Sequence, residues 1–298
     1  MANTAAPTTR TTTAKAFPLR FVLVTFAFTW AFWLLAVLEA RGMTSSLPVP
    51  ALFFGALGPM VAAVVLTAQE GGRAELRSLL NRVVRWRVAP FWYGVALLGP
   101  FVLQLGAMAL HVLLGGQPPD LLAMIEALPT VLALSVYMFI QVGIGEEIGW
   151  RGYALPKLQT GYSALISSLI LGVIWVLWHL PLFFNPATSY SITPFWVFLV
   201  FLLPLPIVYT WIFNSTGGSV LMAMILHAVT NASSGPLWRA TAEYSTTVSS
   251  TNVYLIQAAL LWIGAIVLVL VYGATDLSRK PKQVLVAPTR DELQPRVR

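Results

Sequence analysis

The sequence predicts an all-α protein, a polytopic transmembrane helical bundle of about eight spans. Three observations support this fold class. Of the 298 residues, 57% are hydrophobic and only 10% are charged, whereas a soluble domain has about 25% charged residues. The mean hydropathy is +0.76. Uncharged runs long enough to cross a bilayer recur along the whole chain.

The spans can be placed in order from these runs. The first 17 residues are rich in Thr and Ala and predict a disordered arm. The apolar stretch after them is too long for the core of a signal peptide, so we expect it to remain as the first span. The spans are expected at residues 21–38, 48–68, 89–114, 129–145, 163–184, 195–213, 219–235 and 252–272. The clusters NPATSYSITP and NSTGG separate the fifth, sixth and seventh spans.

Basic residues indicate the orientation of the bundle. Lys and Arg concentrate in the N-terminal arm, in the second and fourth connections and in the polar tail of residues 276–298, which we expect to be mobile. Under the positive-inside rule this bias predicts that both termini are cytoplasmic. Residues 73–87 carry leucine and valine at helical spacing opposite arginines, which predicts an amphipathic helix on the cytoplasmic leaflet. It is expected to be a connector, with docking of anionic lipid or substrate as the alternative.

Composition also excludes several kinds of chemistry. The chain has no cysteine, which excludes disulfides, thiolate metal sites and cysteine nucleophiles. The net charge of +7 arises from juxtamembrane positions, so no nucleic-acid partner is expected.

The segment GEEIGWRGYALP at 145–156 places two carboxylates at the end of the fourth span. Ionisable residues in spans are costly and usually face the bundle interior. In a helix, Glu147 and Arg151 are four residues apart and are expected to form an ion pair that supports the structure. Glu146 then points in another direction and is a candidate general base. The alternative is that both glutamates are ordinary interfacial charges.

Three further polar side chains lie in later spans. His179 lies deep in the fifth span, and His227 and Asn231 lie one turn apart in the seventh. We expect them to meet Glu146 at one depth of the bundle, forming a polar active site. His111 has no polar neighbour in the sequence and is expected to serve packing.

Two kinds of site are compatible with this set, and both lead to hydrolysis. In one, Glu146 activates a water held with His179, while His227 and Asn231 stabilise the oxyanion. In the other, Glu146, His179 and His227 bind a zinc ion with an open water position. The HExxH spacing of soluble zinc proteases is absent.

The motifs EEIGWR, WVLWH and HAVTN together resemble the CPBP family of intramembrane metalloproteases, also called the CAAX prenyl protease 2 (Rce1-like) or Abi family. The family pattern is EExxxR, then FxxxH, then HxxxN. Trp175 stands where the second motif more often has phenylalanine. The resemblance covers residues 128–235, which would be the catalytic core. Residues 18–127 would hold the N-terminal spans, and 236–275 the last loop and span.

This resemblance implies an endopeptidase that acts on a membrane-embedded or membrane-associated peptide or protein. Glu146 would activate water, His179 would hold water or metal, and His227 with Asn231 would form the oxyanion site. Family members are described both as zinc enzymes and as metal-free, glutamate-dependent enzymes. Eukaryotic members act on prenylated proteins, whereas bacterial members are linked to bacteriocin maturation or immunity. The composition is consistent with a bacterial plasma membrane.

Two other functions remain open from the sequence. A non-catalytic membrane scaffold or bacteriocin-immunity protein of the same fold would keep the polar residues as a buried network. A transporter would use the intramembrane glutamate as a proton carrier, but transporters usually show broken helices in both halves of the chain. Here the polar residues occur in one half.

Overall fold

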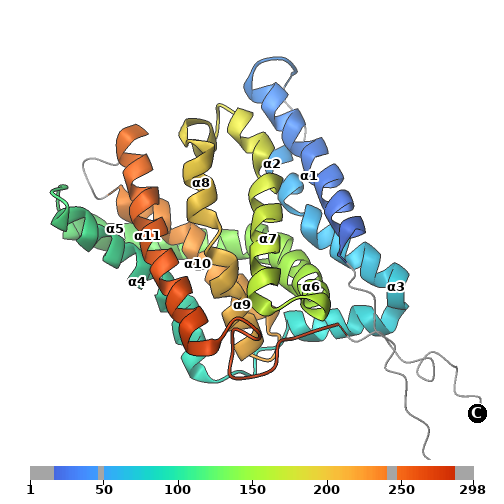
Figure 1. The fold of residues 1–298 in the computed structure, drawn as a ribbon. Helices are drawn as coiled ribbons and strands as arrows, with labels where there is room; N and C mark the ends of the chain where they lie inside the picture. Colours follow the sequence, from blue (N-terminus) through green and yellow to red (C-terminus); the bar gives the residue numbers. More distant parts are fainter. Residues whose placement is uncertain (1–16, 46–49, 240–246, 286–298) are drawn as a thin grey trace, which may run out of the picture.

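The computed structural model describes residues 17–45, 50–239 and 247–285, and in these ranges the chain is helical with no β-strand. The predicted N-terminal arm and the end of the predicted tail lie outside the described residues. Figure 1 shows α7, α9 and α10 in the middle of the bundle, α1 to α3 on one side, and α4, α5 and α11 on the other. The elements are α1 (Leu19–Ala40), α2 (Ala51–Ala56), α3 (Gly58–Val83), α4 (Pro90–Leu113), α5 (Leu121–Met138), η1 (Phe139–Glu147), η2 (Trp150–Ala154), α6 (Leu155–Gly161), α7 (Ala164–Trp178), η3 (Leu180–Phe184), η4 (Ser189–Ile192), α8 (Phe195–Leu202), α9 (Leu205–Ser215), α10 (Val220–Trp238) and α11 (Thr247–Tyr272).

Seven helical segments in the described part of the chain are long and apolar enough to cross a membrane. They correspond to the predicted spans except the second. Residues 51–68 are divided between the short α2 and the start of α3, because the chain bends at Leu57 just before Pro59. α3 then continues through Glu70, Arg73 and Glu75, so it lacks an apolar stretch of full span length. The cytoplasmic position of both termini stays a prediction, and it requires that α2 and the start of α3 together make an eighth crossing.

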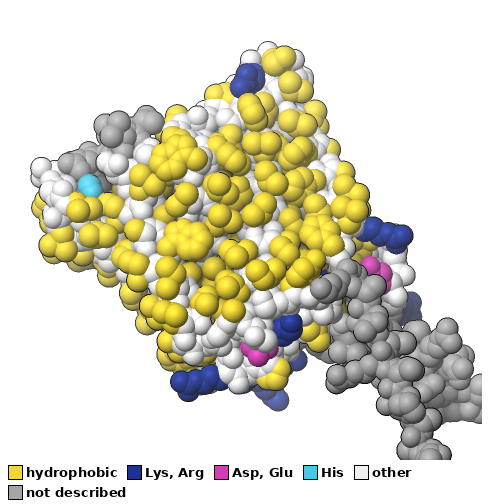
Figure 2. Space-filling model, in the orientation of Figure 1, with side chains coloured by type: hydrophobic (Ala, Val, Ile, Leu, Met, Phe, Trp, Pro, Cys, Tyr) yellow, Lys and Arg dark blue, Asp and Glu magenta, His cyan; other side chains and the backbone are white. Residues whose placement is uncertain are grey.

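The outer surface of the bundle is suited to lipid. Large apolar side chains are exposed on several helices, including Leu98 and Val102 of α4, Leu132 of α5 and Leu270 of α11. Figure 2 shows that hydrophobic side chains cover most of one face, while Lys and Arg gather mainly along its lower edge. This distribution, together with seven candidate spans, describes an integral, multi-pass membrane protein.

The helix α10 lies at the centre of the bundle. It packs against α4, α5, η1 and α9, and most of its side chains are buried. Ser219 caps its N-terminus by accepting a hydrogen bond from the Met222 backbone N–H. The preceding NSTGG segment forms the predicted break, since Gly217 and Gly218 adopt φ angles of +66° and +84°.

The predicted amphipathic helix is the second half of α3. It begins after a kink at Gly72, where φ is +60°, and ends at Val83 rather than at residue 87. Leu79 of its apolar face is buried, and Arg82 Nη2 donates a hydrogen bond to the Gly152 carbonyl at 3.0 Å. This helix therefore packs on the protein itself and is not simply spread on the leaflet.

The helix of the fourth predicted span does not stop at the double glutamate. The two glutamates lie inside a continuous helical stretch, Leu121–Gly161, in which α5 widens into the π-helices η1 and η2 before α6. π-Helical turns are rare and are frequent at functional sites. Glycines let this wide helix approach its neighbours: a Cβ on Gly149 would lie 2.5 Å from Pro59 of α3.

The first part of the predicted polar tail is also packed, which differs from the expectation of a mobile segment. Asn214 of α9 donates hydrogen bonds to Gln159 Oε1 at 2.8 Å and to the Asp276 carbonyl at 2.7 Å. Gln159 Nε2 donates to the Gln283 carbonyl at 2.7 Å. These amides fix residues 276–283 against α6 and α9.

Candidate active site

A cavity of about 380 Å³ lies inside the bundle, and the four predicted catalytic residues all line it. Glu146 comes from η1, His179 from the end of α7, and His227 and Asn231 from α10. The expected convergence of these side chains is therefore present. His179 lies within the span Ala164–Phe184, as predicted, at the point where α7 ends and η3 begins.

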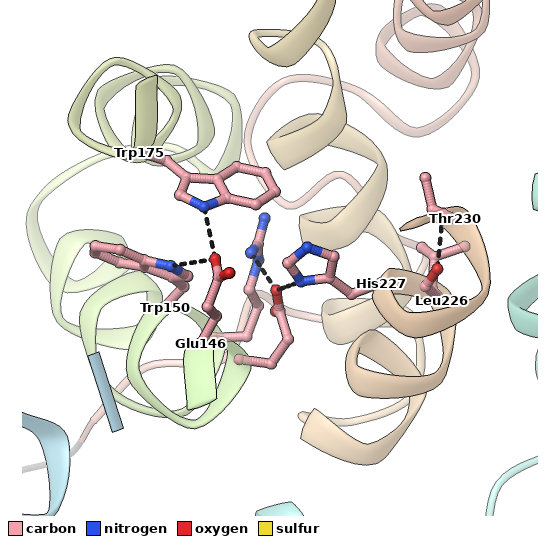
Figure 3. Close-up of polar contacts among 8 residues, drawn as sticks. Glu146, Trp150, Trp175, Leu226, His227 and Thr230 are labelled. Carbon is pink, nitrogen blue, oxygen red and sulfur yellow. Dashed lines mark hydrogen bonds and ion pairs between the residues drawn. The ribbon is translucent and has the colours of Figure 1, made fainter. Parts of the chain in front are cut away.

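Glu146 is held by two tryptophans. Its Oε2 accepts hydrogen bonds from Trp175 Nε1 at 2.8 Å and from Trp150 Nε1 at 3.3 Å, as the dashed lines in Figure 3 show. The carboxylate is 3% exposed, yet no cation is paired with it among the described residues. The second oxygen, Oε1, takes no part in the two indole contacts and is available to a small molecule in the cavity.

Glu147 has a different environment. Its Oε1 accepts a hydrogen bond from Arg151 Nη1 at 2.8 Å, and neither side chain is exposed. The predicted ion pair is thus confirmed. The guanidinium also lies over the rings of Tyr209 and Trp175, with Cζ 4.2 and 5.1 Å from the ring centroids. Because the Glu147 carboxylate is already paired with Arg151, it is less suited than Glu146 to accept a proton.

Each of the two histidines of the cavity has one ring nitrogen in a hydrogen bond. His179 Nδ1 lies 2.8 Å from the Trp175 carbonyl, and His227 Nδ1 lies 2.8 Å from Glu147 Oε1. A carbonyl or an ion-paired carboxylate can only accept, so Nδ1 carries the proton in both rings. In a neutral ring Nε2 then has a free lone pair, which can accept a proton, hold a water or bind a metal.

Aromatic rings restrict the position of His179. Its centroid lies 4.8 Å from that of Trp178, 5.7 Å from that of Tyr190 and 5.2 Å from that of Phe198. Burial raises the pKa of Tyr190, so its hydroxyl stays protonated beside the cavity. Asn231, in contrast to the buried histidines, is exposed on the cavity wall.

Four of these contacts are not evident from the sequence. The contact between Glu147 and His227 joins residues 80 positions apart, and no local spacing indicates it. Trp150 and Trp175, which donate to Glu146, both lie in the family motifs, but the motif pattern indicates Trp175 only as a replacement for phenylalanine. The spacing of Trp175 and His179, four residues apart in one span, could have indicated that the indole N–H lies near the site. No pattern in the sequence indicates the stacking of Tyr209 on Arg151.

The donor chemistry of the cavity suits a metal ion only in part. Two imidazoles with bare Nε2 atoms, each oriented through Nδ1–H by an oxygen acceptor, resemble the histidines of zinc sites. However, no three His, Asp or Glu side chains in the described residues are grouped closely enough to hold an ion in the present arrangement. The structure thus shows suitable ligand types that are not assembled as a ligand set.

Fold and site together define a class: an integral membrane protein with carboxylates and imidazoles around an internal cavity, as in an intramembrane hydrolase. Comparison with known proteins then narrows this class. Residues 128–233 match the family model "Type II CAAX prenyl endopeptidase Rce1-like". A protein from Methanococcus maripaludis named CAAX prenyl protease 2 is 27% identical over 227 residues, which are 72% of this chain and 82% of the relative. These matches support assignment to the CAAX protease (CPBP) family and, in general terms, a membrane endopeptidase.

Proposed function

We propose that this protein hydrolyses a peptide bond in or near the membrane, using a water molecule activated by Glu146. The observation that carries the proposal is the state of the Glu146 carboxylate. One of its oxygens is fixed by two indole N–H groups, while the other oxygen remains for a water in a cavity shared with His179, His227 and Asn231. A buried carboxylate without a cationic partner is suited to act as a general base.

In the proposed reaction, Glu146 Oε1 takes a proton from water as the water oxygen attacks the scissile carbonyl carbon. His179 Nε2 accepts a hydrogen bond from the other O–H of this water and thereby orients the nucleophile. The resulting tetrahedral intermediate collapses with cleavage of the C–N bond. Glu146 returns its proton to the departing amine, so the carboxylate is regenerated and no further reactant is needed.

His227 and Asn231 would stabilise the oxyanion. Because His227 Nδ1–H points to Glu147, its Nε2 can donate to an oxyanion only when the ring is protonated. Glu147 Oε1 lies 2.8 Å from Nδ1 and holds the ring in this orientation. Asn231 supplies a neutral amide donor from the next turn of α10. Glu147 thus acts through His227 and Arg151, as a positioning residue.

A zinc ion is the alternative way to activate the water. Glu146, His179 and His227 are the residues that would hold it, and the ion would supply Lewis-acid activation of the nucleophile. The metal-free and the zinc-dependent mechanisms use the same residues and give the same products. A chelator can therefore distinguish them, whereas a mutation cannot.

The substrate we propose is a membrane-associated protein, since the cavity lies between helices of the bundle and is lined largely by apolar and aromatic side chains. The curated relative is named for prenylated CAAX substrates. Prenylation of the substrate is therefore one arm of the test, alongside unmodified hydrophobic peptides.

The test uses purified protein in detergent and two probes, a quenched library of hydrophobic peptides and a farnesylated CAAX peptide. Wild type is compared with Glu146→Gln and with the control Glu126→Gln, a carboxylate exposed on α5. We expect cleavage by wild type and by the control but not by Glu146→Gln. Cleavage by Glu146→Gln at the wild-type rate would refute the proposal. Activity lost with a chelator and restored by zinc would select the metal form, and resistance to the chelator the metal-free form.

A further inference from the structure

The cavity has a second polar group that the reaction does not use. Gln104 of α4, Trp238 of α10 and Gln257 of α11 all line it. Gln104 and Gln257 are 1% and 2% exposed, in candidate spans that contain no Asp, Glu, Lys or Arg. Polar side chains in a membrane span are costly to bury and are usually retained for a function.

The orientation of both amides follows from one indole. Trp238 Nε1 donates to Gln104 Oε1 at 2.8 Å, and an indole N–H can only donate. The amide oxygen of Gln104 must therefore face Trp238. Gln257 reaches the same oxygen at 2.9 Å, so the group that it presents there must be its amide nitrogen. The usual ambiguity between amide oxygen and nitrogen is removed.

This arrangement leaves one donor and one acceptor on the cavity wall. Among the described residues, Gln104 Nε2 donates no hydrogen bond and Gln257 Oε1 accepts none. A buried amide group without a partner costs free energy, unless water or a ligand satisfies it. A peptide group offers the complement, a C=O for Gln104 Nε2 and an N–H for Gln257 Oε1.

We propose that Gln104 and Gln257 form a subsite for a backbone peptide group of the substrate, away from the scissile bond. The proposal rests on the peptidase function proposed above. The subsite would recognise the peptide backbone, so binding there would not depend on the substrate side chain at that position. A cavity of about 380 Å³ falls within the range of ligand sites, about 300–1,000 Å³, and reaches from Glu146 to both glutamines.

The test combines a protein variant with a change in the substrate backbone. Peptides that the protein binds or cleaves are remade with one ester in place of each amide in turn, which removes a single N–H donor. In Glu146→Gln protein, binding is measured without catalysis. We expect one ester position to weaken binding about tenfold, the effect of one hydrogen bond. Gln257→Leu should weaken binding of the normal peptide by a similar factor and abolish the effect of that ester.

A matched control separates recognition from a structural role. Gln159 and Asn214 also form a buried amide pair between helices, but neither lines the cavity. Gln159→Leu should lower stability and leave peptide affinity and the ester effect unchanged. If Gln257→Leu behaves in the same way, the subsite is refuted and the glutamines serve packing.

The same experiment distinguishes failure of the subsite from failure of the peptidase function. Peptides that bind with the expected ester effect, but are not cleaved by wild type, support the subsite and refute the hydrolase. Peptides that are cleaved with no ester effect at any position outside the scissile bond support the hydrolase and refute the subsite. If none of the probe peptides binds, the subsite is refuted as well.

Discussion

Replacing each adjacent glutamate with glutamine separates a chemical role from a structural one. Glu147 and Arg151 form a fully buried ion pair at 2.8 Å, and breaking such a pair costs about 3–5 kcal/mol because the remaining charge has no partner. A glutamine oxygen can still accept one hydrogen bond, so we expect about 3 kcal/mol for Glu147→Gln. Glu146 accepts only neutral indole donors, and glutamine can accept the same bonds. Glu146→Gln should change stability by less than about 1 kcal/mol.

Thermal unfolding in detergent, followed by tryptophan fluorescence, measures the difference. At about 2–4 °C per kcal/mol, Glu147→Gln should lower the midpoint by about 6–12 °C. Glu146→Gln should unfold near wild type and lose about 10²–10⁴-fold in the rate of peptide cleavage. The double variant Glu147→Gln/Arg151→Gln should be more stable than Glu147→Gln, since it also removes the unpaired charge. A Glu147→Gln variant as stable as wild type, or a double variant less stable than Glu147→Gln, would refute this reasoning.

Three further substitutions, one of them with a matched control, test other contacts. Trp175→Phe removes the 2.8 Å donor to Glu146 and should lower kcat about tenfold with KM nearly unchanged; in peptide kinetics, an effect on KM alone would contradict a positioning role. Gly149→Ala brings a methyl group to 2.5 Å from α3 and should lower stability by about 1–3 kcal/mol, whereas Gly264→Ala meets open space and should be neutral or slightly stabilising in the same unfolding assay. Asn214→Leu breaks the bonds that fix residues 276–283 and should make them sensitive to protease without changing KM; equal protection in both proteins would show that these bonds do not hold the segment.

Much of the fold could be predicted because span length, charge and chain-breaking residues act locally. The seven spans found among the described residues match predicted ones, and the i, i+4 spacing of Glu147 and Arg151 correctly predicted their ion pair. The second predicted span is not among these seven helices, for a physical reason. Its apolar run is long enough, but the bend before Pro59 divides it, and whether a helix bends there depends on its neighbours.

The residues of the site could be predicted from the sequence, but the contacts between them could not. Ionisable groups in apolar spans are so few that Glu146, His179 and His227 could be selected without coordinates. Which of their atoms are engaged depends on contacts between distant segments, such as His227 with Glu147. The subsite formed by Gln104 and Gln257 was missed because uncharged amides do not stand out in an apolar sequence, and their significance comes from a shared indole donor.

The central position of α10 also bears on how the protein is made. α10 is the least apolar of the seven candidate spans and the most buried, so lipid alone would accept it poorly during insertion. Its main partners, α4, α5 and η1, precede it in the chain and are synthesised first. We expect α10 to enter the membrane against these helices, followed by the strongly apolar α11. The cavity is therefore completed only after α10 and α11 have been inserted, and chains that lack them would carry no assembled cavity.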